Sequence, residues 1–307
     1  MHTVLKQISQ VGLVPVIKLE EPNNAVSLCS ALAKGGIPVA EVTFRAKGAE
    51  KAIFNIANAL PQVLVGAGTV TTVEQAKAAA SAGAKYIISP GFDPVVVEYC
   101  LSHNILITPG CATAGDLCMA SRMGLEVVKF FPAEAAGGIR ALKAFFGPFA
   151  QLKFMPTGGI NAQNVTEYLA HRQIIACGGS WMAPEKLIAE QNWSGITAVA
   201  EQAVLGMLQP RLTGLTLPGD SDESANPLLA NLGLESGSFA VAQVEPGAPE
   251  CSGWSLTVNS VERAVTYFTA KGLTFLPQTA KHAANGACTE IQLANKLAGF
   301  SVTLRQA

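Results

Sequence analysis

The sequence predicts an α/β protein: a (β/α)8 barrel followed by a small C-terminal α+β domain. Three observations support this prediction. Short apolar segments alternate with amphipathic ones over the first two-thirds of the chain. Glycines and polar residues gather where the apolar segments end, and the composition changes after residue 208. Such alternation is typical of parallel strands joined by helices.

Eight apolar segments have the composition of strands buried in a parallel sheet. They are residues 13–19, 39–44, 63–66, 86–89, 105–108, 127–131, 152–156 and 174–177. The segments between them predict helices at 25–34, 51–60, 73–82, 94–103, 114–123 and 139–146. A doubly wound open sheet is the alternative. The sequence does not support this alternative, because residues 18–22, KLEEP, stand where a dinucleotide-binding sheet needs a glycine-rich turn after its first strand.

Composition excludes several classes of protein. The formal net charge of -1 gives no electrostatic footprint for nucleic acid or an anionic membrane. Seven cysteines without a CxxC pair predict a reducing compartment, and four scattered histidines form no metal-binding pattern. The first residues do not resemble a signal peptide, and no apolar run reaches membrane-spanning length. We therefore expect a cytoplasmic protein without a metal or other cofactor.

Lys129 interrupts the apolar segment 125–134. Burying an ammonium group costs several kcal/mol unless a partner neutralises it or its proton is lost. One reading places Lys129 at a strand end, reaching solvent or pairing with Glu126 or Glu134. The other makes it an amine that attacks a ketone to form a Schiff base.

Polar residues at the ends of the other predicted strands favour the second reading. In a barrel these ends share one rim, where active sites form. Glu41 and Arg45 alone could be a structural ion pair, and Thr69 alone could be a helix N-cap. Chance would rarely place an acid, an arginine, a threonine and a lysine together on one rim.

Glycine pairs follow the seventh and eighth strands. Gly158-Gly159 and Gly178-Gly179, the latter followed by Ser180, would expose the backbone N–H groups of strand–helix turns. Such turns bind phosphate, and barrels commonly bind it after these two strands. Simple turn chemistry is the alternative explanation.

Six motifs together resemble the 2-keto-3-deoxy-6-phosphogluconate (KDPG) aldolase family. They are EVTFR at 41–45, VGAGTV at 65–70, ISPG at 88–91, KFFPAE at 129–134, PTGGI at 156–160 and GGSW at 178–181. The resemblance runs from about residue 8 to 208. It implies a homotrimeric class I aldolase that cleaves a phosphorylated keto acid, 2-dehydro-3-deoxy-6-phosphogluconate, to pyruvate and glyceraldehyde 3-phosphate. Activity on 4-hydroxy-2-oxoglutarate often accompanies it.

The resemblance also implies a role for each residue. Lys129 matches the Schiff-base lysine and Glu41 the general acid/base. Arg45 and Thr69 match the residues that hold the pyruvyl carboxylate. Pro90 and Phe131 match apolar walls, and Thr157 a hydrogen-bonding position. The phosphate cradle matches Gly158, Gly159, Gly178, Gly179 and Ser180. A galactonate-derived substrate, or a phosphosugar-binding barrel without a covalent step, remains as an alternative.

Beyond residue 208 a polar, turn-rich stretch predicts a linker over 209–236 and a small domain over 237–307. Strands are expected at 239–244, 254–258, 273–276, 288–293 and 300–304, with a helix at 261–270. This βαβββ order is similar to one glyoxalase/vicinal-oxygen-chelate module. Glu290 is the one candidate metal ligand on the later strands, and a lone carboxylate more often lies on a solvated face. We expect a structural or regulatory domain.

Overall fold

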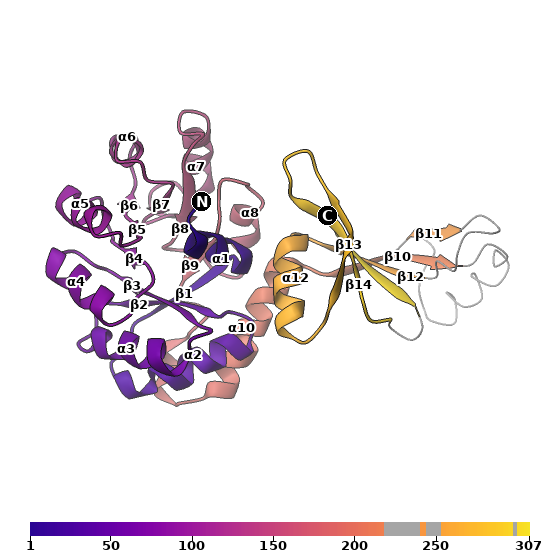
Figure 1. Ribbon diagram of the computed structural model, residues 1–307, viewed down its shortest axis with the longest axis horizontal. Coiled ribbons are helices and arrows are strands. Elements are labelled where there is room, and N and C mark those ends of the chain that lie inside the picture. The colour runs from indigo at the N-terminus through magenta and orange to yellow at the C-terminus, as the bar shows by residue number, and fades with distance from the viewer. Residues whose placement is uncertain (218–239, 244–252, 297–299) are drawn as a thin grey trace. The chain divides into compact units, whose positions relative to one another are not determined.

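The computed structural model describes residues 1–217, 240–243, 253–296 and 300–307 (Figure 1). Contacts within the chain divide it into two compact units, Met1–Met207 and Leu208–Ala307.

The first unit is an α/β fold built on a curled sheet of short parallel strands. These are β1 Leu13–Ile17, β2 Val39–Thr43, β3 Leu64–Gly68, β4 Ile87–Ile88, β5 Ile107–Thr108, β6 Gly110–Cys111, β7 Val127–Phe130, β8 Lys153–Pro156 and β9 Cys177–Gly179. Neighbouring strands pair in the orders β5-β4-β3-β2-β1-β9 and β6-β7-β8. Isolated parallel bridges join Phe154 to Ile174 and Thr157 to Gly178, next to β8 and β9.

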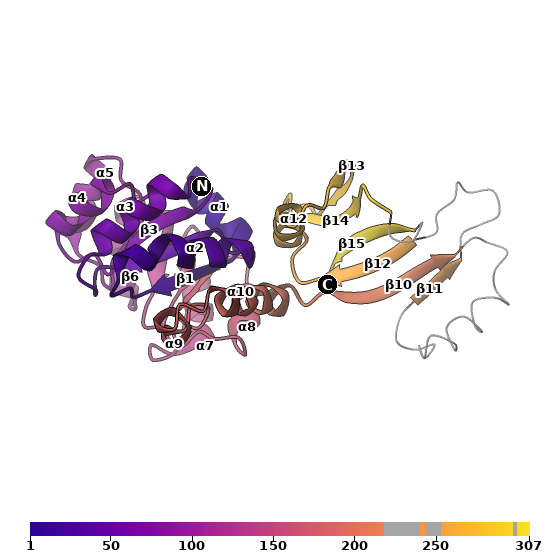
Figure 2. The same cartoon turned by 90° about the horizontal axis from the view of Figure 1, so that it is seen from below.

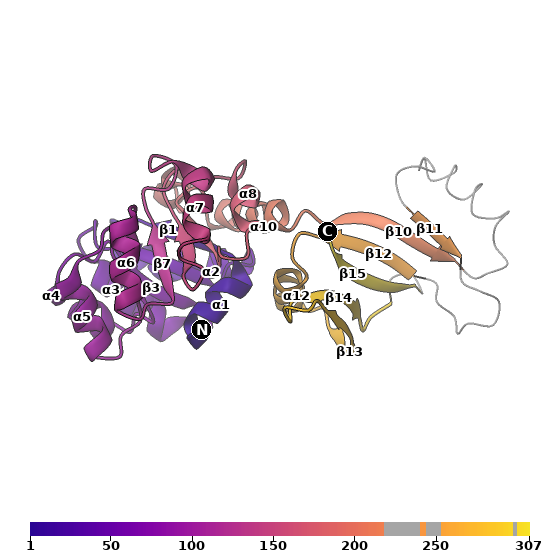
Figure 3. The ribbon, with the colours of Figure 1, turned by 90° about the horizontal axis from the view of Figure 1, so that it is seen from above.

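Helices follow the strands and lie outside the curled sheet (Figures 1 and 3). They are α1 Thr3–Val11, α2 Ala25–Lys34, α3 Ala49–Ala59, α4 Val73–Ser81, α5 Pro94–Ser102, α6 Ala114–Arg122, α7 Gly138–Phe146, α8 Val165–Leu169, α9 Glu185–Ala189 and α10 Trp193–Leu208, with a 3-10 turn at Pro22–Asn24. Capping side chains explain where several of these helices begin. Thr72 and Asp93 cap α4 and α5, and Thr113 forms a capping box with Asp116 at α6.

The strands of the first unit depart most from expectation in two places. The fifth strand is interrupted at Pro109, which has no N–H to donate, and its carbonyl accepts a hydrogen bond from Lys129 N at 2.9 Å. The last strand lies at Cys177–Gly179 rather than 174–177, because glycine backbone pairs with β1 despite its low strand propensity. Helices α1, α8, α9 and α10 were not predicted from the sequence.

The described residues of the second unit form a mixed sheet and the helix α12 (Figure 2). The elements described there are β10 Arg211–Leu217, β11 Ala240–Gln243, β12 Gly253–Val258, α12 Val261–Ala270, β13 Phe275–His282, β14 Cys288–Leu293 and β15 Ser301–Gln306. The strand order is β11-β10-β12-β15-β14-β13. Val261, Ala264 and Tyr267 of α12 are buried, as are Ile291 and Leu304 of the sheet.

Part of the segment expected to be a linker is a strand. Residues 211–217 form β10, which pairs antiparallel with β12, because an alternating β-branched and apolar stretch finds a partner edge in the second unit. The rest of the expected linker, 218–236, lies outside the described residues. Glu290 forms ion pairs with Lys281 at 2.7 Å and Arg305 at 3.0 Å. Its carboxylate is therefore engaged by cations of the neighbouring strands.

None of the helices in the described ranges combines the length and the apolar character that a bilayer crossing requires. No three histidine, cysteine, aspartate or glutamate side chains in those ranges are grouped to hold a metal ion.

Candidate active site

The sheet brings Glu41 of β2 and Lys129 of β7 together, although 88 residues separate them in sequence. Lys129 Nζ lies 3.3 Å from Glu41 Oε1, and the two residues are 5% and 1% exposed. Glu41 is the middle residue of β2 and Lys129 is the last but one of β7, so both side chains lie in the part of the sheet that leads to the carboxyl ends of the strands. Water screens a pair this deeply buried very little.

The Glu41 side chain has room to reach Lys129 because the neighbouring strand, β3, carries a glycine, Gly68, beside it. A Cβ on Gly68 would overlap the Glu41 carboxylate. The second carboxylate oxygen, Oε2, is buried and has no hydrogen-bond partner among the described residues. Buried polar atoms rarely go unpaired, so an orphan oxygen beside a buried lysine points to a role in ligand binding or proton transfer.

A cavity of about 250 Å³ opens over this pair. Its lining is Val16, Glu41, Arg45, Thr69, Pro90, Lys129, Phe131, Thr157, Gly158, Gly159, Ile160, Gly179 and Ser180. All but one of the residues predicted for the site therefore lie around one cavity. Gly178 lies behind it, where a Cβ would overlap Thr157 Oγ1. Val16 and Ile160 were missed, because an apolar residue on a strand or turn carries no signal that separates it from core.

The two alternative readings of the rim residues do not hold. Glu41 pairs with Lys129, and no ion pair joins it to Arg45 in the described part of the chain. Thr72, not Thr69, caps α4. Thr69 has a φ of 57°, a left-handed conformation that a β-branched residue seldom adopts outside functional sites.

The cavity has an apolar wall and a polar lining. The Phe131 ring centroid is 5.1 Å from Lys129 Nζ, so the aromatic face contacts the amine. The Gly158–Gly159 turn lies beside this ring, because a Cβ on Gly158 would come within 3.3 Å of Phe131 Cε2. Gly158 and Gly159 have φ values of 99° and 82°, which only glycine adopts without strain. Thr157 Oγ1 is buried there without a hydrogen-bond partner among the described residues. Arg45 and Ser180 lie exposed on the rim.

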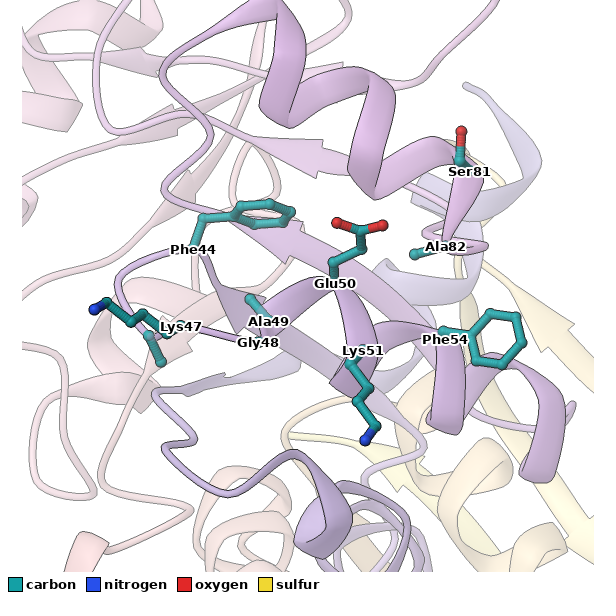
Figure 4. Close-up of a pocket in the computed structure, with 10 residues that line it drawn as sticks. Phe44, Lys47, Gly48, Ala49, Glu50, Lys51, Phe54, Ser81 and Ala82 are labelled. Atoms are coloured by element: carbon teal, nitrogen blue, oxygen red, sulfur yellow. The ribbon is translucent and has the colours of Figure 1, made fainter.

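A larger cavity of about 560 Å³ lies between the β2–α3 turn and the end of α4 (Figure 4). Phe44, Lys47, Glu50, Lys51 and Phe54 are among the residues that line it. The side chains of Lys47 and Lys51 extend away from the Glu50 carboxylate. It contains no buried acid–base pair. The smaller cavity is therefore the better candidate for chemistry.

Comparison with known proteins agrees with this choice. The model of the KDPG and KHG aldolase family matches residues 4–199. The chain belongs to this family. The resemblance seen in its six motifs is thereby confirmed, and the family fold accounts for the curled parallel sheet of the first unit.

Individual members of the family match at substantial identity. A 2-dehydro-3-deoxy-phosphogluconate aldolase of Treponema pallidum is 46% identical over 204 residues, 66% of this chain and 97% of that protein. A KDPG aldolase of Legionella pneumophila, solved with pyruvate captured at low pH as a covalent carbinolamine, superposes with a TM-score of 0.64 at 41% identity. It covers 66% of this chain and 98% of its own.

A third member was solved with a phosphorylated ligand. The KDPG aldolase of Zymomonas mobilis ZM4, solved with 3-phosphoglycerate, has a TM-score of 0.60 and 35% identity, over 65% of this chain and 94% of that one. These family members match about two-thirds of this chain and almost all of their own length.

Proposed function

We propose that this chain is a class I aldolase that cleaves 2-dehydro-3-deoxy-6-phosphogluconate to pyruvate and glyceraldehyde 3-phosphate. The observation that carries the proposal is the buried Lys129–Glu41 pair, 3.3 Å apart at the floor of a 250 Å³ cavity. An amine that forms an imine must be available in its neutral form, and a carboxylate in direct contact can take its proton.

Lys129 is proposed as the nucleophile. Its neutral amine adds to the C2 ketone of the substrate, and loss of water from the carbinolamine gives an iminium. The iminium then accepts the electron pair released when the C3–C4 bond breaks, which leaves an enamine of pyruvate. Protonation of that enamine at C3 and hydrolysis of the imine release pyruvate and restore the amine.

Glu41 is proposed as the acid and base for these proton transfers. Its Oε1 faces Lys129, while Oε2 is buried without a protein partner among the described residues. This division suits two tasks. One oxygen exchanges a proton with the amine during carbinolamine formation, and the other removes the proton of the C4 hydroxyl, directly or through a water.

The remaining lining residues fit the two ends of the substrate. Arg45 and Thr69 offer a fixed cation and a hydroxyl for the carboxylate. Pro90 and Phe131 form the apolar wall that keeps water from the enamine. Thr157 Oγ1 has no hydrogen-bond partner among the described residues and can therefore bond the substrate chain. The glycine turns at 158–159 and 178–180 would receive the phosphate through backbone N–H groups.

The proposal extends to architecture and assembly. With β5 and β6 taken as one interrupted strand, and with the bridges beside β8 and β9, the strands follow one another around a (β/α)8 barrel. A homotrimer is proposed from the family resemblance.

A coupled assay for pyruvate, run with 2-dehydro-3-deoxy-6-phosphogluconate, tests the function directly. Borohydride added with pyruvate should reduce the imine and attach a stable adduct to Lys129, which peptide mass spectrometry would locate. The galactonate epimer in the same assay tests the alternative substrate. Absence of both pyruvate release and an adduct in folded protein would refute the proposal.

Ser180 tests the phosphate end of the cavity. Ser180→Ala removes one exposed hydroxyl donor, so we expect the KM for the phosphorylated substrate to rise about fivefold, or about 1 kcal/mol, with little change in kcat. Steady-state kinetics on 4-hydroxy-2-oxoglutarate, which has no phosphate, is the control. An equal loss on both substrates would contradict the phosphate assignment.

Removal of the second unit should leave an active enzyme. All proposed site residues lie in Met1–Met207, and the matched relatives reach nearly full length without a counterpart to the remainder. Truncation after Leu208 is expected to change kcat less than twofold in the coupled assay. A soluble, trimeric truncated protein with more than tenfold lower activity would show that residues beyond 208 complete or gate the site.

A further inference from the structure

The loop that follows Lys129 is joined to the turn that carries Gly158 and Gly159. Ala133 N donates to Thr157 O at 2.8 Å, and Glu134 N donates to Gly158 O at 3.0 Å. A Cβ on Gly158 would approach Pro132 Cα to 3.2 Å, so the two backbones are in close contact. The nucleophile and the glycine turn are therefore connected by a few residues of packed backbone.

The side chain of Glu134 lies against the second glycine of that turn. A Cβ on Gly159 would come within 2.5 Å of Glu134 Cγ. The carboxylate end is held from another element, because the Tyr168 hydroxyl of α8 donates to Glu134 Oε1. Tyr168 is 1% exposed, and burial together with the Glu134 carboxylate raises the pKa of its hydroxyl. Tyr168 thus keeps its proton and remains a donor at neutral pH.

The opposite side of Gly159 is held by amides. Asn164 Nδ2 donates to Gly159 O at 3.1 Å, and Asn161 Nδ2 donates to the same oxygen at 3.4 Å. These contacts fix the carbonyl, and the Glu134 stem fixes the Cα from the other side. Without these contacts a Gly-Gly turn would sample many conformations, and ordering it would cost conformational entropy.

We propose that Glu134 and Tyr168 are positioning residues that hold the Gly158–Gly159 turn in the shape that receives the substrate phosphate. The inference rests on the function proposed above. Neither side chain lines the cavity, so both act through the turn. Glu134 fills the space beside Gly159. Glu134 is exposed and would gain rotamer freedom if its side chain extended into solvent, and the hydrogen bond from Tyr168 opposes this change of rotamer. Phosphate binding then does not have to order the turn.

Two reactions distinguish a role in positioning the glycine turn from a general loss of active-site structure. Cleavage of the phosphorylated substrate needs the turn. Exchange of the methyl hydrogens of pyruvate with D2O needs only the imine: a methyl C–H loses its proton to form the enamine, which regains a deuteron from solvent. Proton NMR follows this exchange without any phosphate present.

Tyr168→Phe removes the hydroxyl and keeps the ring, and Glu134→Met removes the acceptor and keeps the unbranched stem. Each is expected to raise the KM for 2-dehydro-3-deoxy-6-phosphogluconate at least fivefold, and to weaken competitive inhibition by inorganic phosphate to a similar degree. The rate of pyruvate exchange should stay within about twofold. Because the two side chains act through one contact, the double variant should be no worse than either single variant.

Tyr86→Phe is the matched control. Tyr86 is also 1% exposed, and its hydroxyl donates to Ala40 O at 2.8 Å, next to Glu41 rather than at the glycine turn, so that a disturbance of Glu41 would affect cleavage and exchange alike. Its loss should lower thermal stability by a similar amount without changing the ratio of the two activities.

Two results would overturn the inference: an unchanged KM in both variants, or a parallel fall of cleavage and exchange. Failure of the proposed function would look different, because the unmodified protein would then show neither exchange nor a borohydride adduct.

Discussion

Replacing Lys129 by alanine is expected to lower turnover by at least about three to four orders of magnitude, which corresponds to about 4–5.5 kcal/mol of activation free energy. The iminium is the electron sink for C3–C4 cleavage, and Lys129 is the amine that lines the cavity with Glu41. The measurement is pyruvate release in the coupled assay, together with loss of the borohydride adduct.

Stability must be controlled in this experiment, because the substitution leaves a buried carboxylate without its cation. Removing one partner of a buried ion pair typically costs about 3–5 kcal/mol unless the remaining group becomes neutral. Lys129→Met keeps most of the stem, and Lys129→Met with Glu41→Gln removes both charges. Circular dichroism and thermal melting show whether each variant is folded. Near-normal turnover in a folded variant would exclude the Schiff-base mechanism.

Glu41→Gln should separate proton transfer from imine formation. The amide has the size of the carboxylate and can still accept a hydrogen bond from Lys129 through its oxygen, but it cannot take the proton of the C4 hydroxyl. We expect turnover to fall about 10²–10⁴-fold while borohydride still traps a pyruvate adduct.

The time course of trapping provides the control for this variant. If Glu41 also moves protons in carbinolamine formation, the adduct should form more slowly but reach the same yield. Glu50→Gln, an acid on the other, larger cavity, should leave both turnover and trapping unchanged. Full turnover in folded Glu41→Gln would remove Glu41 from the mechanism.

Much of the first unit follows from short-range patterns. The helix α2 begins and ends where its periodicity predicts, at Ala25 and Lys34. The motif resemblance named the family correctly. It also assigned Glu41 and Lys129 to one site, and the structure places the two side chains in contact. Local sequence carries this information because helix caps, strand composition and turn glycines act over a few residues.

Other features depend on partners far away in the chain. Residues 177–179 form a strand because β1 provides an edge to pair with, and 211–217 form one because β12 does. Neither segment has a composition that would reveal the partner. The conformational entropy lost when such a segment is ordered is offset only when the fold supplies the pairing.

The sequence by itself determined the family, the alternation of strands and helices, and the residue types at the strand ends. Only the tertiary structure decided that Glu41 Oε1 lies 3.3 Å from Lys129 Nζ while Oε2 has no partner among the described residues, and that Tyr168 holds Glu134 against Gly159. The physical reason is that these contacts join different strands and helices. The distances in these contacts depend on the curvature of the sheet and on the absence of a side chain at Gly68. No local sequence pattern records either of these features.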